Sequence, residues 1–263
     1  MAAFLLLTFI FTWTVWIGLA MWAPDGNRAI FAPGGAIFLL GVFAPGLVAL
    51  GLTARKEGRA GVARLVAGIG RWEVGGGWYL FAVSYMAVNR LLAALIHRIV
   101  IGTWPAFGDT PVIVMLGAIL VSTWVQAGEE LGWRAYALPR LARSLGLGGA
   151  SVAIGVIWAV WHLPLFFIPD AGVTGQSFPI YLLSVTSLSV LLGWLYWKTE
   201  GSLLLVMLMH ASVNNTMGIV PGAMPNATDP LSFNGTLIFW ASTGISVVAA
   251  ALLLPRMRGA RIH

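Results

Sequence analysis

The chain has 263 residues, of which 59% are hydrophobic and only 9% are charged. Soluble domains are about 45–50% apolar and about 25% charged, so this composition excludes a conventional soluble protein. Its high hydrophobicity also excludes a disordered chain. The net charge is +6, but the basic residues lie in short segments between apolar runs. There they indicate membrane orientation rather than nucleic-acid binding. Cysteine is absent, which excludes disulfides, thiolate metal sites and a cysteine nucleophile.

The apolar runs predict an all-α, polytopic membrane protein that forms one membrane domain over residues 1–263. A spanning helix needs about 20 mostly apolar residues. The first run has no basic segment in front of it, so we expect a retained helix rather than a cleaved signal. The runs are continuous, unlike the short alternating segments of a membrane barrel. In chain order, the eight predicted spans are 1–22, 30–53, 77–101, 111–139, 151–168, 179–197, 202–220 and 236–254.

The distribution of basic residues predicts the orientation. With eight spans, 12 of the 15 lysines and arginines fall on one side of the membrane. The positive-inside rule then places both termini in the cytoplasm, and we expect a multi-pass protein of a prokaryotic inner or plasma membrane. Segment 55–77 is predicted to be a solvated loop that anchors this orientation; a contact with anionic lipid is the alternative. The twelve are Arg55, Lys56, Arg59, Arg64, Arg71, Arg134, Arg140, Arg143, Lys198, Arg256, Arg258 and Arg261.

The first polar cluster inside a span is Glu129-Glu130-Leu131-Gly132-Trp133-Arg134. Ionisable residues in a membrane are costly and point to function. Glu130 and Arg134 are four residues apart and can pair on one helix face, whereas Glu129 is turned away by about 100°. One carboxylate is then neutralised and the other is free for chemistry. The competing interpretation is a helix end at the membrane surface.

Two further clusters place histidine in apolar runs. Trp158 and His162 are four residues apart and share a helix face, as do His210 and Asn214. Each histidine could instead be a hydrogen-bonded packing residue, since His and Asn often bond between helices in membrane bundles. Sequence spacing alone leaves both interpretations open.

The depths of the clusters favour a common site. Counted from the cytoplasmic ends of their predicted helices, Glu129, His162 and His210 lie roughly 12–17 Å deep at about 1.5 Å per residue. Residues that serve only in packing have no reason to share a depth. The argument requires that the helix carrying Glu129 continue to Pro139.

Two chemistries fit such a site. A carboxylate and an imidazole can deprotonate a water, while a second histidine and an asparagine offer donors to a developing oxyanion. Alternatively, Glu129, His162 and His210 could hold a zinc ion with one open position for water.

Other proteolytic mechanisms lack their motifs. The chain has no His-Glu-x-x-His and no Gly-x-Ser-x-Gly. A pair of intramembrane aspartates is not expected, because all four aspartates fall in predicted loops. They are Asp25, Asp109, Asp170 and Asp229.

The motifs together resemble those of the CPBP family, which contains type II CAAX prenyl endopeptidases and bacteriocin-processing or immunity proteins. Three patterns carry the resemblance, in the family's order and rough spacing. The similar region covers about residues 111–220, which we predict to be the catalytic core. One departure is visible, because the second pattern usually begins with Phe. The patterns are Glu129-Glu130-x-x-x-Arg134, Trp158-x-x-x-His162 and His210-x-x-x-Asn214.

The resemblance implies an eight-helix membrane fold with a polar cavity open to the cytosol. It implies that Glu129 and His162 activate water and that His210 with Asn214 stabilises the oxyanion. Glu130, Arg134 and Trp158 would support the site. We favour a metal-free mechanism without a cofactor, because the site has few soft ligands and no further carboxylate; zinc is the alternative. The expected substrate is a membrane-anchored or lipidated protein or peptide, including the prenylated CAAX type.

Functions of other classes stay open. A transporter or proton channel could use Glu129 and the histidines as a relay, but we find no repeat symmetry of the kind that transporters show. A silent immunity or scaffold protein is a further alternative, although all the motif residues are present. Arg90, inside the third predicted span, either lines the cavity or pairs with a buried carboxylate.

Overall fold

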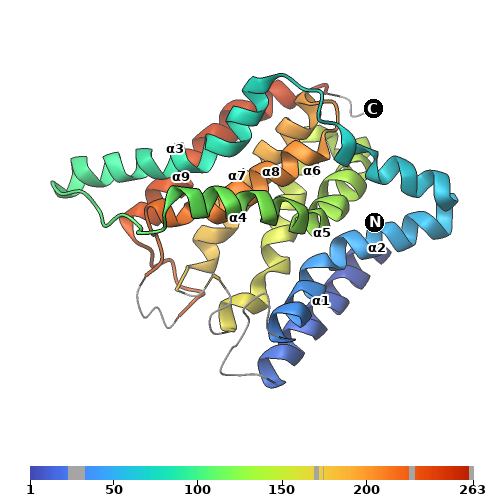
Figure 1. The fold of residues 1–263 in the computed structure, drawn as a ribbon, viewed down its shortest axis with the longest axis horizontal. Coiled ribbons are helices and arrows are strands. Elements are labelled where there is room, and N and C mark those ends of the chain that lie inside the picture. Colours follow the sequence, from blue (N-terminus) through green and yellow to red (C-terminus); the bar gives the residue numbers. More distant parts are fainter. Residues whose placement is uncertain (23–32, 169–171, 174, 225–228, 261–263) are drawn as a thin grey trace.

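The described part of the chain is helical and contains no strand (Figure 1). A computed structural model describes residues 1–22, 33–168, 172–173, 175–224 and 229–260. The predicted all-α fold is confirmed. The α-helices are α1 (Ala2–Trp22), α2 (Pro33–Val66), α3 (Gly76–Ile101), α4 (Val112–Val125), α5 (Ala127–Glu130), α6 (Leu138–Trp161), α7 (Phe178–Lys198), α8 (Leu203–Thr216) and α9 (Leu237–Leu253).

The helices form a bundle in which α6, α7 and α8 occupy the middle. Figure 1 shows α1 and α2 side by side at one end of the bundle, while α3 and α9 pair at the other. α7 packs against both α6 and α9, and α8 packs against α3 and α4. The predicted site residues therefore lie in the middle of the bundle or next to it, on α5, at the end of α6 and on α8.

Six described helical stretches are long and apolar enough to cross a membrane, so the chain is a multi-pass membrane protein. The predicted number of eight is not confirmed. The fourth and fifth predicted spans form one helical stretch, Val112–Phe167, and the seventh, Leu203–Ile219, is shorter than the length required. Gly146 accounts for the merger, because its left-handed backbone (φ 67°, ψ 168°) turns the chain inside α6 without an intervening loop.

Segment 55–77 differs from the predicted loop. Helix α2 continues to Val66, with a break at Gly58, and a 3₁₀ turn follows from Ala67 to Gly70. Helix prevails here because Leu65 is buried in the hydrophobic core, which gives the segment an apolar face. The side chains of residues 54–60 are exposed, so the charges are solvent-accessible as predicted.

Some predicted features fall outside the described residues. These include Asp25, Asp170, Arg261 and the first three residues of the second predicted span. Asp109 and Asp229 lie in loops, as predicted. Arg134 is one of the twelve basic residues assigned to the cytoplasmic side, but it is not at a membrane surface, since its side chain is 1% exposed and is paired with Glu130.

The outer faces of the helices are apolar. On α4 the side chains of Ile113, Leu120 and Val121 are 76%, 67% and 69% exposed. Comparable apolar side chains lie on the outside of α1, where Leu6 and Ile10 are 62% and 63% exposed. Contiguous exposed apolar surface of this kind is unfavourable in water, and it is what a lipid-facing helix presents.

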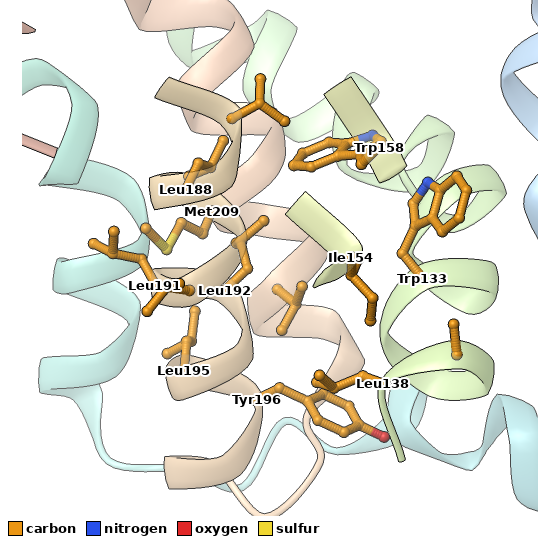
Figure 2. Packing of buried hydrophobic residues seen from close by; sticks show 14 of the residues in the cluster. Trp133, Leu138, Ile154, Trp158, Leu188, Leu191, Leu192, Leu195, Tyr196 and Met209 are labelled. Atoms are coloured by element: carbon orange, nitrogen blue, oxygen red, sulfur yellow. The ribbon is translucent and has the colours of Figure 1, made fainter. Parts of the chain in front are cut away.

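The core lies between α6, α7 and α8. Leu191, Leu192 and Leu195 of α7 pack against Ile154 of α6 and Met209 of α8 (Figure 2). Each of these five side chains is at most 1% exposed. Figure 2 also shows Trp158 and Trp133 at one edge of this cluster, so the site described below borders a tightly packed region.

Glycines allow α2 to approach the segment that carries the two glutamates. A Cβ atom at Gly46 would lie 2.7 Å from the carbonyl oxygen of Gly128, and one at Gly128 would lie 2.9 Å from Cα of Phe43. A Cβ atom at Gly132 would lie 2.5 Å from Cβ of Pro45. Small residues permit such backbone contacts between membrane helices, so this packing fixes the position of α5 against α2.

We predict that Gly132→Ala lowers the thermal unfolding midpoint in detergent. The new methyl group would overlap Pro45, and overpacking of this kind costs about 1–3 kcal/mol. Gly117→Ala is the matched control, because a Cβ atom there has nothing within 4 Å and alanine is the better helix former. Equal midpoints for the two variants would contradict the close packing of α2.

Candidate active site

The two glutamates lie in a continuous helix. Glu129 and Glu130 end α5, and the π-helix η2 (Leu131–Ala137) carries Arg134 and leads directly into α6. The helix thus continues past Pro139, as the argument from depth requires. His162 directly follows α6. The α-helix ends here because Pro164 has no N–H to donate to the carbonyl of Val160, and a 3₁₀ helix, Leu163–Phe167, follows.

Glu130 is the centre of a buried polar network. Its Oε1 accepts hydrogen bonds from Nη1 of Arg134 at 3.0 Å and from Nδ1 of His210 at 2.7 Å. The three side chains are 0%, 1% and 4% exposed, respectively. The ion pair with Arg134 is the one that the sequence spacing predicted. The contact with His210 was not predicted, and it joins α5 to α8.

Trp158 links this network to Glu129. Its indole Nε1 donates to Oε2 of Glu129 at 2.6 Å. The guanidinium carbon of Arg134 lies 4.4 Å from the indole centroid, a favourable cation–π distance, and the ring of His210 lies edge-on at 5.1 Å. A phenylalanine here would keep the ring contacts but could not donate to Glu129.

His162 is oriented by its own helix and by aromatic rings. Its Nδ1 lies 2.9 Å from the carbonyl oxygen of Trp158. A carbonyl can only accept, so Nδ1 carries the proton and Nε2 of the neutral ring keeps a lone pair. The rings of Trp161 and Tyr181 lie 4.6 Å and 5.7 Å away. His162 therefore presents a proton acceptor, Nε2, on the side of the ring away from the carbonyl of Trp158.

Two adjoining cavities meet at the predicted site residues. The inner cavity, of about 90 Å³, is lined by Tyr85, Arg90 and Ser242 among others. The outer cavity, of about 410 Å³, is lined by Trp16 and Phe38 among others. His210 and Trp158 line the inner one only. The residues that line both are Glu129, His162, Gln176, Tyr181, Asn214 and Met217.

The structure thus brings Glu129, His162, His210 and Asn214 to one place. Asn214 is accessible within both cavities, whereas the adjacent Asn215 bonds to Ser122 and to the carbonyl of Ala211. The two asparagines therefore differ in role, one facing the cavity and the other linking α8 to α4.

Sequence reasoning missed two residues of the site. Tyr181 lies near the start of α7 and Gln176 in the loop before it, and both line the two cavities. Neither belongs to a spaced motif, so no sequence signal indicated them. Arg90 lines the inner cavity. This is one of the two alternatives predicted for it, the other being a pair with a buried carboxylate.

The predicted zinc ligands are Glu129, His162 and His210. In the described ranges, no three His, Asp or Glu side chains are arranged so that they could hold a metal ion. Nδ1 of His210 and Oε2 of Glu129 are already engaged by Glu130 and Trp158. The metal-free mechanism stays a prediction, because these bonds do not use Oε1 of Glu129 or Nε2 of His210.

Comparison with known proteins finds a family model that matches the central segment. Residues 108–216 match the model of the Rce1-like family, type II CAAX prenyl endopeptidases. The resemblance predicted from the motifs is confirmed. The chain is also 31% identical over 110 residues to CAAX prenyl protease 2 of Methanococcus maripaludis. The match covers 40% of this chain and 38% of that protein, so the similarity spans less than half of either.

We predict that Glu130→Gln destabilises the protein. Removal of one partner from a buried ion pair costs about 3–5 kcal/mol. Glu57→Gln is the control, because Glu57 pairs with Arg64 and Arg140 while its side chain is 37% exposed, and such pairs contribute only about 0–1 kcal/mol. Thermal unfolding in detergent compares the two. Unchanged stability of Glu130→Gln with complete loss of activity would make Glu130 a direct catalyst instead.

Proposed function

We propose that the chain is an intramembrane endopeptidase that hydrolyses a peptide bond with water activated by Glu129 and His162. One observation carries the proposal. Glu129, His162 and Asn214 line the junction of two cavities inside the helix bundle, with His210 beside them. The match of the surrounding segment to a prenyl endopeptidase family supports the reaction class.

Glu129 is the general base of the proposed reaction. The hydrogen bond from Trp158 orients the carboxylate through Oε2 and leaves Oε1 to accept the proton of a water. Nε2 of His162, which keeps its lone pair, accepts a second hydrogen bond from that water. A water held by two acceptors in this way is oriented for attack on a carbonyl carbon.

His210 and Asn214 stabilise the oxyanion. To act as an oxyanion donor while it bonds to Glu130, His210 has to carry a proton on both ring nitrogens. An imidazolium at His210 uses Nδ1 for Glu130 and has an N–H at Nε2 for the oxyanion. The amide of Asn214 supplies the second donor. Donors held by a rigid site are effective because they need no reorganisation during the reaction.

The proton balance closes within the site. Glu129 takes one proton from water as the oxygen–carbon bond forms, and gives it to the leaving amine as the carbon–nitrogen bond breaks. Product release leaves Glu129 ionised again. No side-chain nucleophile and no cofactor is needed.

The outer cavity favours a membrane-anchored or lipidated substrate. Trp16, Phe38, Leu39 and Val42 give it an apolar wall between α1 and α2. A prenyl chain or an apolar peptide segment can be buried there, while the polar peptide bond reaches Glu129. A protein of the CAAX type, prenylated near its C-terminus, combines both features.

The proposed orientation places both termini in the cytoplasm. It rests on the basic residues near the ends of the spans, such as the exposed Arg55, Lys56 and Arg59. Arg134, buried beside Glu130, does not contribute to this signal.

Glu129→Gln should lower the cleavage rate of a farnesylated CAAX-type peptide by about 10²–10⁴, because glutamine cannot accept the proton. Its stability should change little, since one carbonyl oxygen can still accept from Trp158. Glu73→Gln, at an exposed position, is the matched control and should keep full activity. Failure of the unmodified protein to cleave any lipidated peptide would instead favour a transport or scaffold function.

Chelator treatment should leave the activity intact under this mechanism. The test is cleavage before and after exhaustive EDTA treatment, together with the zinc content of the purified protein. A zinc-dependent reaction would lose activity with the metal and regain it on addition of zinc. Activity that follows zinc occupancy would overturn the metal-free mechanism and leave the protease assignment standing.

A further inference from the structure

Arg90 is a buried cation without a counter-ion. It lies in the middle of α3 and is 3% exposed. Its Nε and Nη1 atoms are buried and have no hydrogen-bond partner in the described part of the chain. No carboxylate of that part lies within ion-pair distance of it. A charged group inside a membrane bundle is strongly unfavourable unless it is paired, so Arg90 calls for an anion.

Helix packing does not account for Arg90. The adjacent Asn89 joins α3 to α9, because its amide donates to the carbonyl of Ser242 and to Oγ of Ser246. The hydroxyl of Ser242 donates back to Oδ1 of Asn89 at 2.5 Å. This part of the interface is therefore satisfied by Asn89, and the guanidinium of Arg90 takes no part in it.

The surroundings of Arg90 suit a small anion. Arg90 lines the inner cavity together with Glu129 and His210, and Glu129 is the one carboxylate of that lining. The volume of about 90 Å³ equals that of about three water molecules, so a carboxylate group fits. The loop at Gly222 approaches closely, since a Cβ atom there would lie 2.7 Å from Nη1 of Arg90.

We infer that Arg90 binds the C-terminal carboxylate of the substrate peptide. The planar guanidinium can hold a carboxylate through two parallel hydrogen bonds. The inference rests on the proposed endopeptidase function and adds the direction in which the substrate peptide binds. The C-terminal carboxylate lies in the inner cavity, and the lipidated side of the scissile bond lies in the outer one. Cleavage then occurs at a fixed distance from the end of the chain.

Three farnesylated peptides of equal length test the source of the carboxylate. The first has a free C-terminal carboxylate, and the second has a C-terminal amide. The third also has a C-terminal amide, but its last residue is a glutamate. A hydrogen bond to a charged group is worth about 1.5–3 kcal/mol, so the unmodified protein should cleave the free acid with a kcat/KM about 10- to 100-fold above the amide. If the glutamate peptide matches the free acid, an acidic side chain is the ligand and the C-terminal assignment is overturned.

Arg90→Met should remove the preference for the free acid, and Arg90→Lys should keep part of it. Arg98→Met is the matched control, because Arg98 lies on the same helix and is exposed; it should keep the full preference. If Arg90→Met does not fold, the acid-to-amide ratio in Arg90→Lys still decides. An unchanged ratio in the Arg90 variants would overturn the inference while the endopeptidase function stands.

Binding separates this inference from the proposed function. A short peptide with the C-terminal sequence of the substrate and a free carboxylate should raise the thermal unfolding midpoint of the intact protein, and its amide should not. The shift should disappear in Arg90→Met or, if that variant does not fold, shrink in Arg90→Lys. This result would support the site even if the protein cleaved none of the peptides. Equal shifts with acid and amide would overturn it.

Discussion

The carboxylate of Glu130 fixes the site, because its Oε1 accepts from Arg134 in η2 and from His210 in α8. All three side chains are almost fully buried, where the attraction between opposite charges is weakly screened. Displacement of any one of them would leave a charge or a polar group unpaired in the bundle. The relative position of the two helices therefore follows from this contact, and so does the direction in which the ring of His210 points.

The two adjacent glutamates have different environments. Glu130 faces the guanidinium of Arg134 and is fixed by its bonds to Arg134 and His210. Glu129 faces the cavities and accepts a hydrogen bond from the indole N–H of Trp158. Close packing of α2 on Gly128 and Gly132 leaves little room for this segment to move. The rigid network around Glu130 thus supports the carboxylate of Glu129, which lines the cavities. A well-positioned carboxylate of this kind suits proton transfer.

Local features of the site were predictable from the sequence, and long-range ones were not. The Glu130–Arg134 pair follows from helical spacing alone, and the apolar runs are long enough to indicate membrane helices. The His210–Glu130 bond joins residues 80 positions apart, which no spacing rule reaches. The same holds for Tyr181, which enters the site through the packing of α7. The eight predicted spans are not confirmed as separate helices, because one glycine, Gly146, turns the chain within α6 where a loop was expected.

A double-mutant cycle on Glu130 and His210 tests the central contact most directly. The unfolding free energy is measured in detergent for Glu130→Gln, His210→Gln and the double variant. Residues in direct contact within a buried network show coupling energies of about 0.5–3 kcal/mol, and the short buried bond between these two predicts at least about 1 kcal/mol. Effects that add to within about 0.5 kcal/mol would contradict the role of Glu130 in holding η2 and α8 together.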